Sequence, residues 1–155
     1  MLNTLAWRQP TIDDPDGLIT SAPTTSRGLP RSIPVAAVHV LARDGPLEHL
    51  CGYLRAVILP VLANDIPAQR SVTFVTGQCF SAFRITPILG RPIVEADAPI
   101  YSPGARVAVI SYGLWTSVSG GDPSALGRSI SVNNVDVEII GVLPRGRCPW
   151  TWNAS

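Results

Sequence analysis

The spacing of apolar and polar residues predicts many short elements along the chain. Residues 18–20 follow a turn-rich segment and indicate a short strand. Between Ser32, which suits an N-cap, and the stop at Asp44-Gly45-Pro46, apolar residues recur at helical spacing. We therefore expect a helix of about three turns there, since one turn takes about 3.6 residues.

The next stretch is rich in β-branched, leucine and aromatic residues and predicts strands near 49–55, 57–62 and 69–75. Asn64-Asp65 and Pro67 are turn and breaker residues between them. The sequence therefore predicts three separate strands before residue 76.

A second helix is expected to begin at Thr76 as its N-cap. Cys79, Phe80 and Phe83 are spaced three and four residues apart, so they share one helical face that can pack on the preceding sheet. Residues 87–92 contain two prolines and a glycine, which predict an extended connector.

The second half of the chain gives the clearest local signals. Residues 106–110 predict a buried strand, and Ser111 caps a helix that ends at Gly120-Gly121. Residues 129–132 and 135–140 alternate around Asn133-Asn134, a pair that tolerates the backbone of a tight type I′ turn. These residues predict a β-hairpin.

These elements predict an α+β fold with a small mixed or antiparallel sheet and short packed helices. A chain of 155 residues that is 46% hydrophobic and 15% charged can bury one core, while 15 prolines and 13 glycines favour many turns. The formal net charge of +1 is spread without runs of like charge, so we expect no nucleic-acid partner.

The three cysteines, Cys51, Cys79 and Cys148, allow at most one intrachain disulfide and lack the paired spacing of a zinc site. Cys51 and Cys79 stand in apolar surroundings. The favoured interpretation of both is that they are small buried hydrophobic residues.

Histidine-based chemistry has few candidates. His39 lies in the first predicted helix and His49 near the following strand, with only Asp44 and Glu48 as nearby acids. There is no GxSxG motif for a nucleophile, and a zinc site would need more Cys or His ligands. Ordinary core or surface histidines are the favoured interpretation, although a Ser-His-Asp arrangement stays open as an alternative.

Residues 120–128, GGDPSALGR, fit neither the P-loop nor the GxGxxG spacing. Their simpler interpretation is a helical turn that begins at Asp122-Pro123 and ends at Gly127. Glu95 and Asp97 form a close acid pair, but their proline-rich connector offers no apolar pocket to raise a pKa. General acid–base catalysis is therefore not expected from them.

Four scattered tryptophans lack the basic interleaving of a nucleic-acid surface, and Trp115 is best interpreted as a core anchor. The longest apolar stretch, residues 56–63, is too short to cross a bilayer, and the start lacks the features of a signal peptide. As written, the chain is expected to have no export route of its own. No catalytic, cofactor-binding or metal-ligating residue is assigned from the sequence.

The order of five sequence blocks resembles the MacB-like periplasmic core domain of FtsX-like or MacB-type ABC transporter permeases. The blocks are Val75–Phe80, Ile85–Pro92, Val107–Trp115, Gly120–Pro123 with Leu126–Arg128, and Ile139–Pro144. Residues 14–19 and 47–53 resemble the earlier part of the same domain more weakly.

The resemblance implies a non-enzymatic α+β domain on the periplasmic face of the bacterial cytoplasmic membrane, without a cofactor. It implies permease transmembrane helices and an ABC ATPase as partners, with an adaptor protein or a second copy as further partners. Such a domain transmits conformational change and contacts substrate or adaptor. The alternatives are a free-standing soluble module that binds a ligand or protein and, less favoured, an uncharacterised hydrolase.

The resemblance divides the chain into an N-terminal extension or linker at 1–16, a core domain at 17–144 that is expected to be incomplete, and an atypical tail at 145–155. After Pro144 the family pattern is expected to continue with a small residue and Gly-Phe, but this chain continues with Arg145-Gly146-Arg147. A fragment, a truncated gene or a frameshift is the hypothesis that follows.

Overall fold

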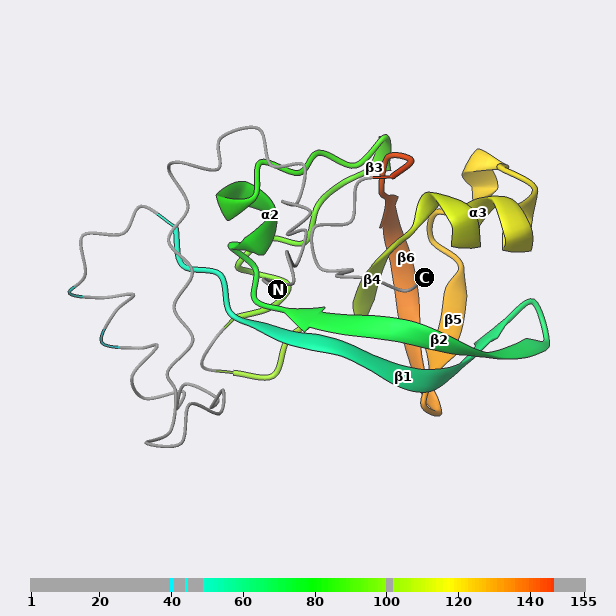
Figure 1. The fold of residues 1–155 in the computed structure, drawn as a ribbon, viewed down its shortest axis with the longest axis horizontal. Coiled ribbons are helices and arrows are strands. Elements are labelled where there is room, and N and C mark those ends of the chain that lie inside the picture. The colour runs from blue at the N-terminus through cyan, green and yellow to red at the C-terminus, as the bar shows by residue number, and fades with distance from the viewer. Residues whose placement is uncertain (1–39, 41–43, 45–48, 100–101, 147–155) are drawn as a thin grey trace, which may run out of the picture.

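A six-stranded mixed sheet organises the protein (Figure 1). The computed structural model describes residues 40, 44, 49–99 and 102–146. The strands are β1 (Tyr53–Ala63), β2 (Ile66–Val75), β3 (Leu89–Gly90), β4 (Val107–Ile110), β5 (Ser129–Val132) and β6 (Val135–Val142). Their order is β2-β1-β5-β6-β3, and β4 pairs with β6. With short helices at its ends, this sheet confirms the expected α+β class.

Strand β6 holds the sheet together because three other strands pair with it. β5 and β3 pair with it antiparallel, whereas β4 runs parallel to it. Its last four residues, 139–142, are all buried. Such a continuous buried run is typical of a strand that is covered on both faces.

The first two predicted strands are one strand, so the expectation of separate strands at 49–55 and 57–62 is wrong. Leu54 pairs with Phe74 and Val57 with Val72, so two residues of β1 oppose one residue of β2. This arrangement is a β-bulge, which bends a strand without ending it. The local irregularity in the sequence is a bulge and not a chain break.

The expected strand at 69–75 also begins earlier, at Ile66. Asn64 and Asp65 form a two-residue turn with φ values of 49° and 61°, so β2 follows β1 directly. Pro67 is tolerated because β2 lies at the end of the strand order and pairs only with β1.

Helix α2 (Cys79–Ala82) is shorter than predicted and begins later. Its N-cap is Gln78, not Thr76. The Thr76 hydroxyl instead accepts a hydrogen bond of 3.0 Å from the Gly52 N–H. The predicted N-cap side chain is thus used to hold the start of β1.

The elements predicted in the second half of the chain are confirmed. In α3 (Tyr112–Ser119), the Ser111 hydroxyl accepts the Leu114 N–H at 3.2 Å, and Gly120 ends the helix in the left-handed conformation. The 3₁₀ turn η2 (Pro123–Ala125) leads to the β5–β6 hairpin, whose turn residues Asn133 and Asn134 have φ values of 50° and 64°. The strand expected at 106–110 is present as β4, although only Ile110 in it is buried, and the extended connector contains the short strand β3, which was not predicted.

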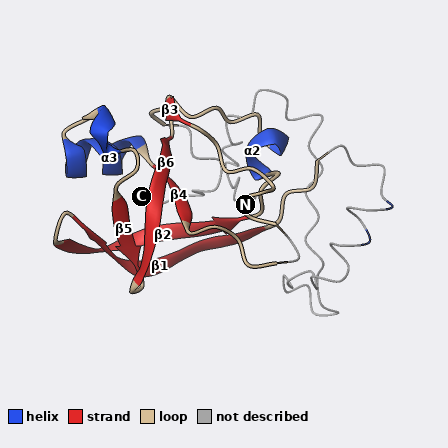
Figure 2. Cartoon of the chain, turned by 180° about the vertical axis from the view of Figure 1, so that it is seen from behind, coloured by secondary structure: helices blue, strands red, loops and turns tan. Residues whose placement is uncertain are grey.

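Two separate hydrophobic cores lie on opposite faces of the sheet at β4 and β6, since the neighbouring residues Val109 and Ile110 contact different cores. The larger core is built from strand residues and is covered by α3 and η2; its buried members are Val61, Ala63, Ile110, Ile130, Ile139 and Val142. The smaller core lies under α2, with Cys79, Phe80 and Leu143 buried. Figures 1 and 2 place α2 and α3 at opposite ends of the molecule.

Two early predictions lie outside the described residues. The strand at 18–20 is one. Of the helix predicted after Ser32, only Val40 and Asp44 are described, and both are helical.

Candidate functional site

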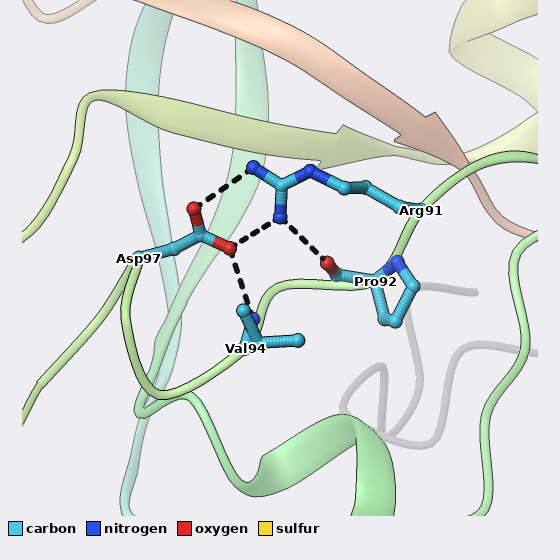
Figure 3. Close-up of polar contacts among 4 residues, drawn as sticks. All are labelled: Arg91, Pro92, Val94 and Asp97. Atoms are coloured by element: carbon cyan, nitrogen blue, oxygen red, sulfur yellow. Dashed lines mark hydrogen bonds and ion pairs between the residues drawn. The ribbon is translucent and has the colours of Figure 1, made fainter.

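The connector between β3 and β4 contains an ion pair whose carboxylate is buried (Figure 3). Asp97 keeps only 10% of its side chain exposed, whereas Arg91 keeps 51%. The Arg91 guanidinium donates from Nη1 to Oδ2 of Asp97 at 2.5 Å and from Nη2 to Oδ1 at 2.9 Å. This two-point geometry is the strongest form of an arginine–carboxylate contact.

Backbone groups complete the coordination of the Asp97 carboxylate. Val94 donates its N–H to Oδ2 at 3.0 Å, and Arg91 Nη1 also donates to the Pro92 carbonyl at 3.2 Å. The hydrogen bond from Arg91 lowers the pKa of Asp97, the Val94 N–H lowers it further, and burial opposes both effects. Asp97 therefore stays ionised at neutral pH.

Glu95 and Asp97, the close acid pair of the sequence, have different surroundings. Glu95 is exposed, and Asp97 is an acceptor for Arg91 and not a proton donor. The sequence analysis missed the partner, Arg91. The signal was present as an arginine and an acid at opposite ends of a short proline-containing segment, although a charge pair at that spacing has no fixed geometry.

Two glycines allow the connector to lie directly on the rest of the domain. The Gly77 N–H donates to the Ala98 carbonyl at 2.9 Å, and a Cβ on Gly77 would lie 2.3 Å from the Glu95 Cα. At Gly104, a Cβ would lie 2.4 Å from the Asp97 carbonyl oxygen. Backbone therefore packs on backbone here, where a side chain has no room.

The β1–β2 hairpin carries most of the large hydrophobic side chains that the described part of the chain leaves exposed. We call Leu54, Val57, Ile58, Leu62, Ile66 and Phe74 the exposed hairpin residues; Ile58 is 63% exposed and Ile66 64%. Clusters of exposed apolar side chains mark contact surfaces more often than scattered ones do. The hairpin is thus the candidate interaction surface.

These residues occupy both sides of the ribbon. Val61 and Ala63 point into the larger core, so alternation along β1 places Ile58 and Leu62 on the opposite face. Leu54 and Phe74 form a cross-strand pair beyond the bulge. The tip is fixed to α3, because the Asn64 amide donates to the Val118 carbonyl at 2.6 Å.

Only two of the four residues considered for histidine chemistry belong to the described part of the chain. His39 and Glu48 lie outside the described residues, and His49 and Asp44 are exposed. Within the described ranges, no three His, Cys, Asp or Glu side chains lie close enough together to hold a metal ion.

The loop at 120–128 has the structural role that the sequence suggested. The Asp122 carboxylate accepts the Ser124 N–H at 2.8 Å, which lowers the pKa of Asp122. Trp115 packs on the larger core and donates its indole N–H to the Asp122 carbonyl at 2.9 Å. Trp7, Trp150 and Trp152 lie outside the described residues.

The interpretation of Cys51 and Cys79 as independent buried residues is wrong, because they form a disulfide with their Cα atoms 4.4 Å apart. Tyr53 pairs with Val75, so the residues just outside the base of the hairpin are neighbours in space. Cys51 and Cys79 lie at nearly equal distances in sequence from the Asn64-Asp65 turn. That symmetry was the signal that could have predicted the bond.

Comparison with known proteins gives the family. The sequence profile described as "MacB-like periplasmic core domain" matches residues 7–150. The chain belongs to this family. No curated protein matches its sequence. As a MacB-like periplasmic core domain, it comes from a family of domains of membrane ABC transporter permeases, and no helix in its described part is long and apolar enough to cross a membrane.

Solved structures support the same fold. The periplasmic region of MacB from Actinobacillus actinomycetemcomitans is 13% identical, with a TM-score of 0.64 over 76% of this chain and 53% of that one. The extracellular domain of the noncanonic ABC-type transporter YknZ from Gram-positive bacteria is 17% identical, with a TM-score of 0.61 over 72% and 57%. This MacB-like domain thus spans little more than half of each solved domain.

Proposed function

We propose that this MacB-like domain is a non-catalytic interaction module of an ABC transporter permease, which contacts substrate or an adaptor protein and transmits conformational change. The exposed hairpin residues are the observation that carries the proposal. They are large, apolar and gathered on one hairpin, and the tip of that hairpin is fixed to α3.

The contact part of the proposal rests on the chemistry of these side chains. Exposed Ile, Leu, Val and Phe side chains gain free energy when a partner removes them from water, at roughly 25 cal/mol for each Å² of apolar surface. Few charges interrupt the ribbon, so the partner surface is expected to be apolar at its centre and polar at its rim.

The transmission part rests on how the hairpin joins the sheet. Val61 and Leu62 of β1 pair with Val132 and Ser131 of β5, and the Asn133 N–H donates to the Pro60 carbonyl at 2.8 Å. β5 then pairs with β6. A force applied to the hairpin therefore acts on the larger core through continuous backbone hydrogen bonds.

Binding measurements test the contact. We would compare the unmodified chain with Ile58→Glu and Ile66→Glu, using the purified adaptor encoded beside the intact permease gene and isothermal titration calorimetry. Each hairpin variant should bind at least about tenfold more weakly, because a charge in an apolar contact is desolvated without a partner. Ile88→Glu is the matched control, since Ile88 is 50% exposed but lies on the connector.

Equal weakening by Ile88→Glu would contradict a role specific to the hairpin. If both hairpin variants bound the adaptor as tightly as the unmodified chain, the hairpin would not be the contact surface. The alternative, a free-standing module that binds through another surface, would then be favoured. For transmission, spin labels on the exposed residues Gln69 and Ser129 should keep a constant separation while ATP is hydrolysed by the intact transporter. A separation that changes with nucleotide would mean that the hairpin bends instead of transmitting motion.

A further inference from the structure

The disulfide between Cys51 and Cys79 lies where the base of the β1–β2 hairpin, helix α2 and the connector meet. Cys51 is half-buried just before β1, and Cys79 is fully buried as the first residue of α2. The two are 28 residues apart, and the loop between them contains the whole β1–β2 hairpin. Figure 1 shows α2 over the end of the hairpin that lies away from its turn.

The smaller core depends on this bond more than the larger core does. Among the described residues its buried members are Cys79, Phe80 and Leu143, so one of the three is itself a disulfide cysteine. Helix α2 has four residues, and a helix of that length has no stability of its own in water. Closing a loop of this size by a disulfide removes much of the entropy of the open state.

The same region holds the connector in place. The Leu50 N–H donates to the Gln78 side-chain oxygen at 2.9 Å, and the Thr76 N–H donates to the Gly52 carbonyl at 2.8 Å. One residue further, Gly77 donates to Ala98. Movement of α2 away from the start of β1 would therefore also release the connector at Gly77.

We propose that the Cys51–Cys79 disulfide is a redox lock on the smaller core. Oxidised, it holds α2 and the connector against the base of the hairpin; reduced, this end of the domain opens while the larger core stays folded. The two thiols close by exchange with the disulfide of a thiol–disulfide oxidoreductase, which leaves as a dithiol, so two electrons and two protons pass to that protein.

Access to the bond is asymmetric. Cys79 is fully buried and Cys51 is half-buried, so a reductant reaches the Cys51 sulfur first. Attack there forms a bond to Cys51 and releases the Cys79 thiolate. The lock can therefore be opened without prior unfolding of the larger core.

Amide hydrogen exchange on the full chain tests the lock. The oxidised sample is compared with one reduced by a trialkylphosphine, which takes one oxygen from water as the disulfide becomes two thiols. Non-reducing peptide mapping should first find Cys51 linked to Cys79. On reduction, the amides of Gly77, Phe83 and Ile85, which are hydrogen-bonded at this end, should exchange at least about tenfold faster.

The larger core supplies the internal control. The amides of Gly127 and Ile139, which donate to the carbonyls of Ile139 and Arg128, should exchange at the same rate in both samples. If Ile139 also exchanged about as much faster as Gly77, Phe83 and Ile85 do on reduction, the disulfide would stabilise the whole domain and the proposal would be wrong. Unchanged exchange at Gly77, Phe83 and Ile85 would overturn it as well.

A variant separates the loss of the bond from the chemistry of the reductant. Cys51→Ala should reproduce the reduced pattern without phosphine, because its site is only half-buried and its partner Cys79 keeps its place in the core. Cys148→Ser should match the unmodified chain in both redox states. If Cys51→Ala exchanged like the oxidised protein, or if Cys148→Ser lost the response to phosphine, the proposal would be wrong.

Discussion

The two β-hairpins use the same turn but differ in what their strands bury. Both turns are two-residue Asn-Asp or Asn-Asn pairs with φ values between 49° and 64°. Among the residues of β1–β2 whose burial is described, Val61 and Ala63 are the buried ones, whereas β6 ends in four consecutive buried residues. A turn sequence therefore fixes a hairpin and its register, while the position of the strands in the sheet decides which side chains leave water.

The largest expected effect comes from cutting a buried side chain in the second hairpin. Ile139→Ala should lower the free energy of unfolding by about 2–4 kcal/mol, because Ile139 is 3% exposed in the larger core and the variant leaves a cavity. Ile58→Ala on the first hairpin should change it by no more than about 0.5 kcal/mol. Urea denaturation checks both, and equal losses would remove the contrast between the hairpins.

The next effect tests how closely the connector lies on β6. A Cβ on Gly141 would be 2.5 Å from the Arg91 carbonyl oxygen, so Gly141→Ala should cost about 1–3 kcal/mol. In α3, Gly113 has open space around it, and Gly113→Ala should stabilise the protein by about 0.5–1 kcal/mol through helix propensity. Thermal unfolding followed by circular dichroism should give shifts of opposite sign; a stable Gly141→Ala variant would contradict the close approach.

The ion pair of the connector gives a pH-dependent effect. Because the folded-state pKa of Asp97 is lowered, mainly by Arg91, its contribution is present above the unfolded-state pKa of about 4 and is lost as pH falls through the folded value. Asp97→Asn should melt about 4 °C lower at pH 7, with the difference shrinking toward pH 3.

Melting curves at closely spaced pH values measure this difference. Glu95→Gln is the matched control, since Glu95 is a nearby acid that is exposed. A difference that stays constant from pH 7 to pH 3 would show that Asp97 contributes by packing and not by its charge.

The smallest effect concerns what the hairpins share. Asp65→Gly and Asn134→Gly place glycine at the second turn residue, where φ is 61° and 64°. Asn-Gly is the preferred pair for such turns, so each variant should be stabilised by about 0.5 kcal/mol. Chemical denaturation measures the gain in unfolding free energy of each variant. A clear difference between the two gains would mean that the contacts of one turn, and not its backbone conformation, decide its stability.

Local signals in the sequence were sufficient wherever a few neighbouring residues determine the structure. Ser111 and Gly120 bound α3 as predicted, and Asn133-Asn134 places the second hairpin. The mixed sheet follows from these elements in outline. The parallel pairing of β4 with β6 does not, because it depends on where a distant strand lies and no local residue specifies it.

Predictions failed where one residue had two competing uses. Thr76 suits an N-cap, but its hydroxyl is taken by the Gly52 N–H across the hairpin. Cys79 suits a buried position, which it has, yet its bond to Cys51 required knowledge of the β1–β2 pairing. The ion pair was missed for a different reason. The loop conformation that brings Arg91 to Asp97 is itself stabilised by that pair, so the spacing of the two residues in sequence does not predict it.

The central place of β6 also sets the order in which the domain can be built. Strands β3, β4 and β5 all precede β6 in the chain and all pair with it. The β1–β2 hairpin closes through local contacts and can form as soon as residue 75 has been synthesised, whereas long-range pairing is slow. The core-facing side chains of the first hairpin, Val61 and Ala63, therefore stay in water until residues 129–142 arrive, and during this interval they add to the apolar surface through which the growing chain can aggregate.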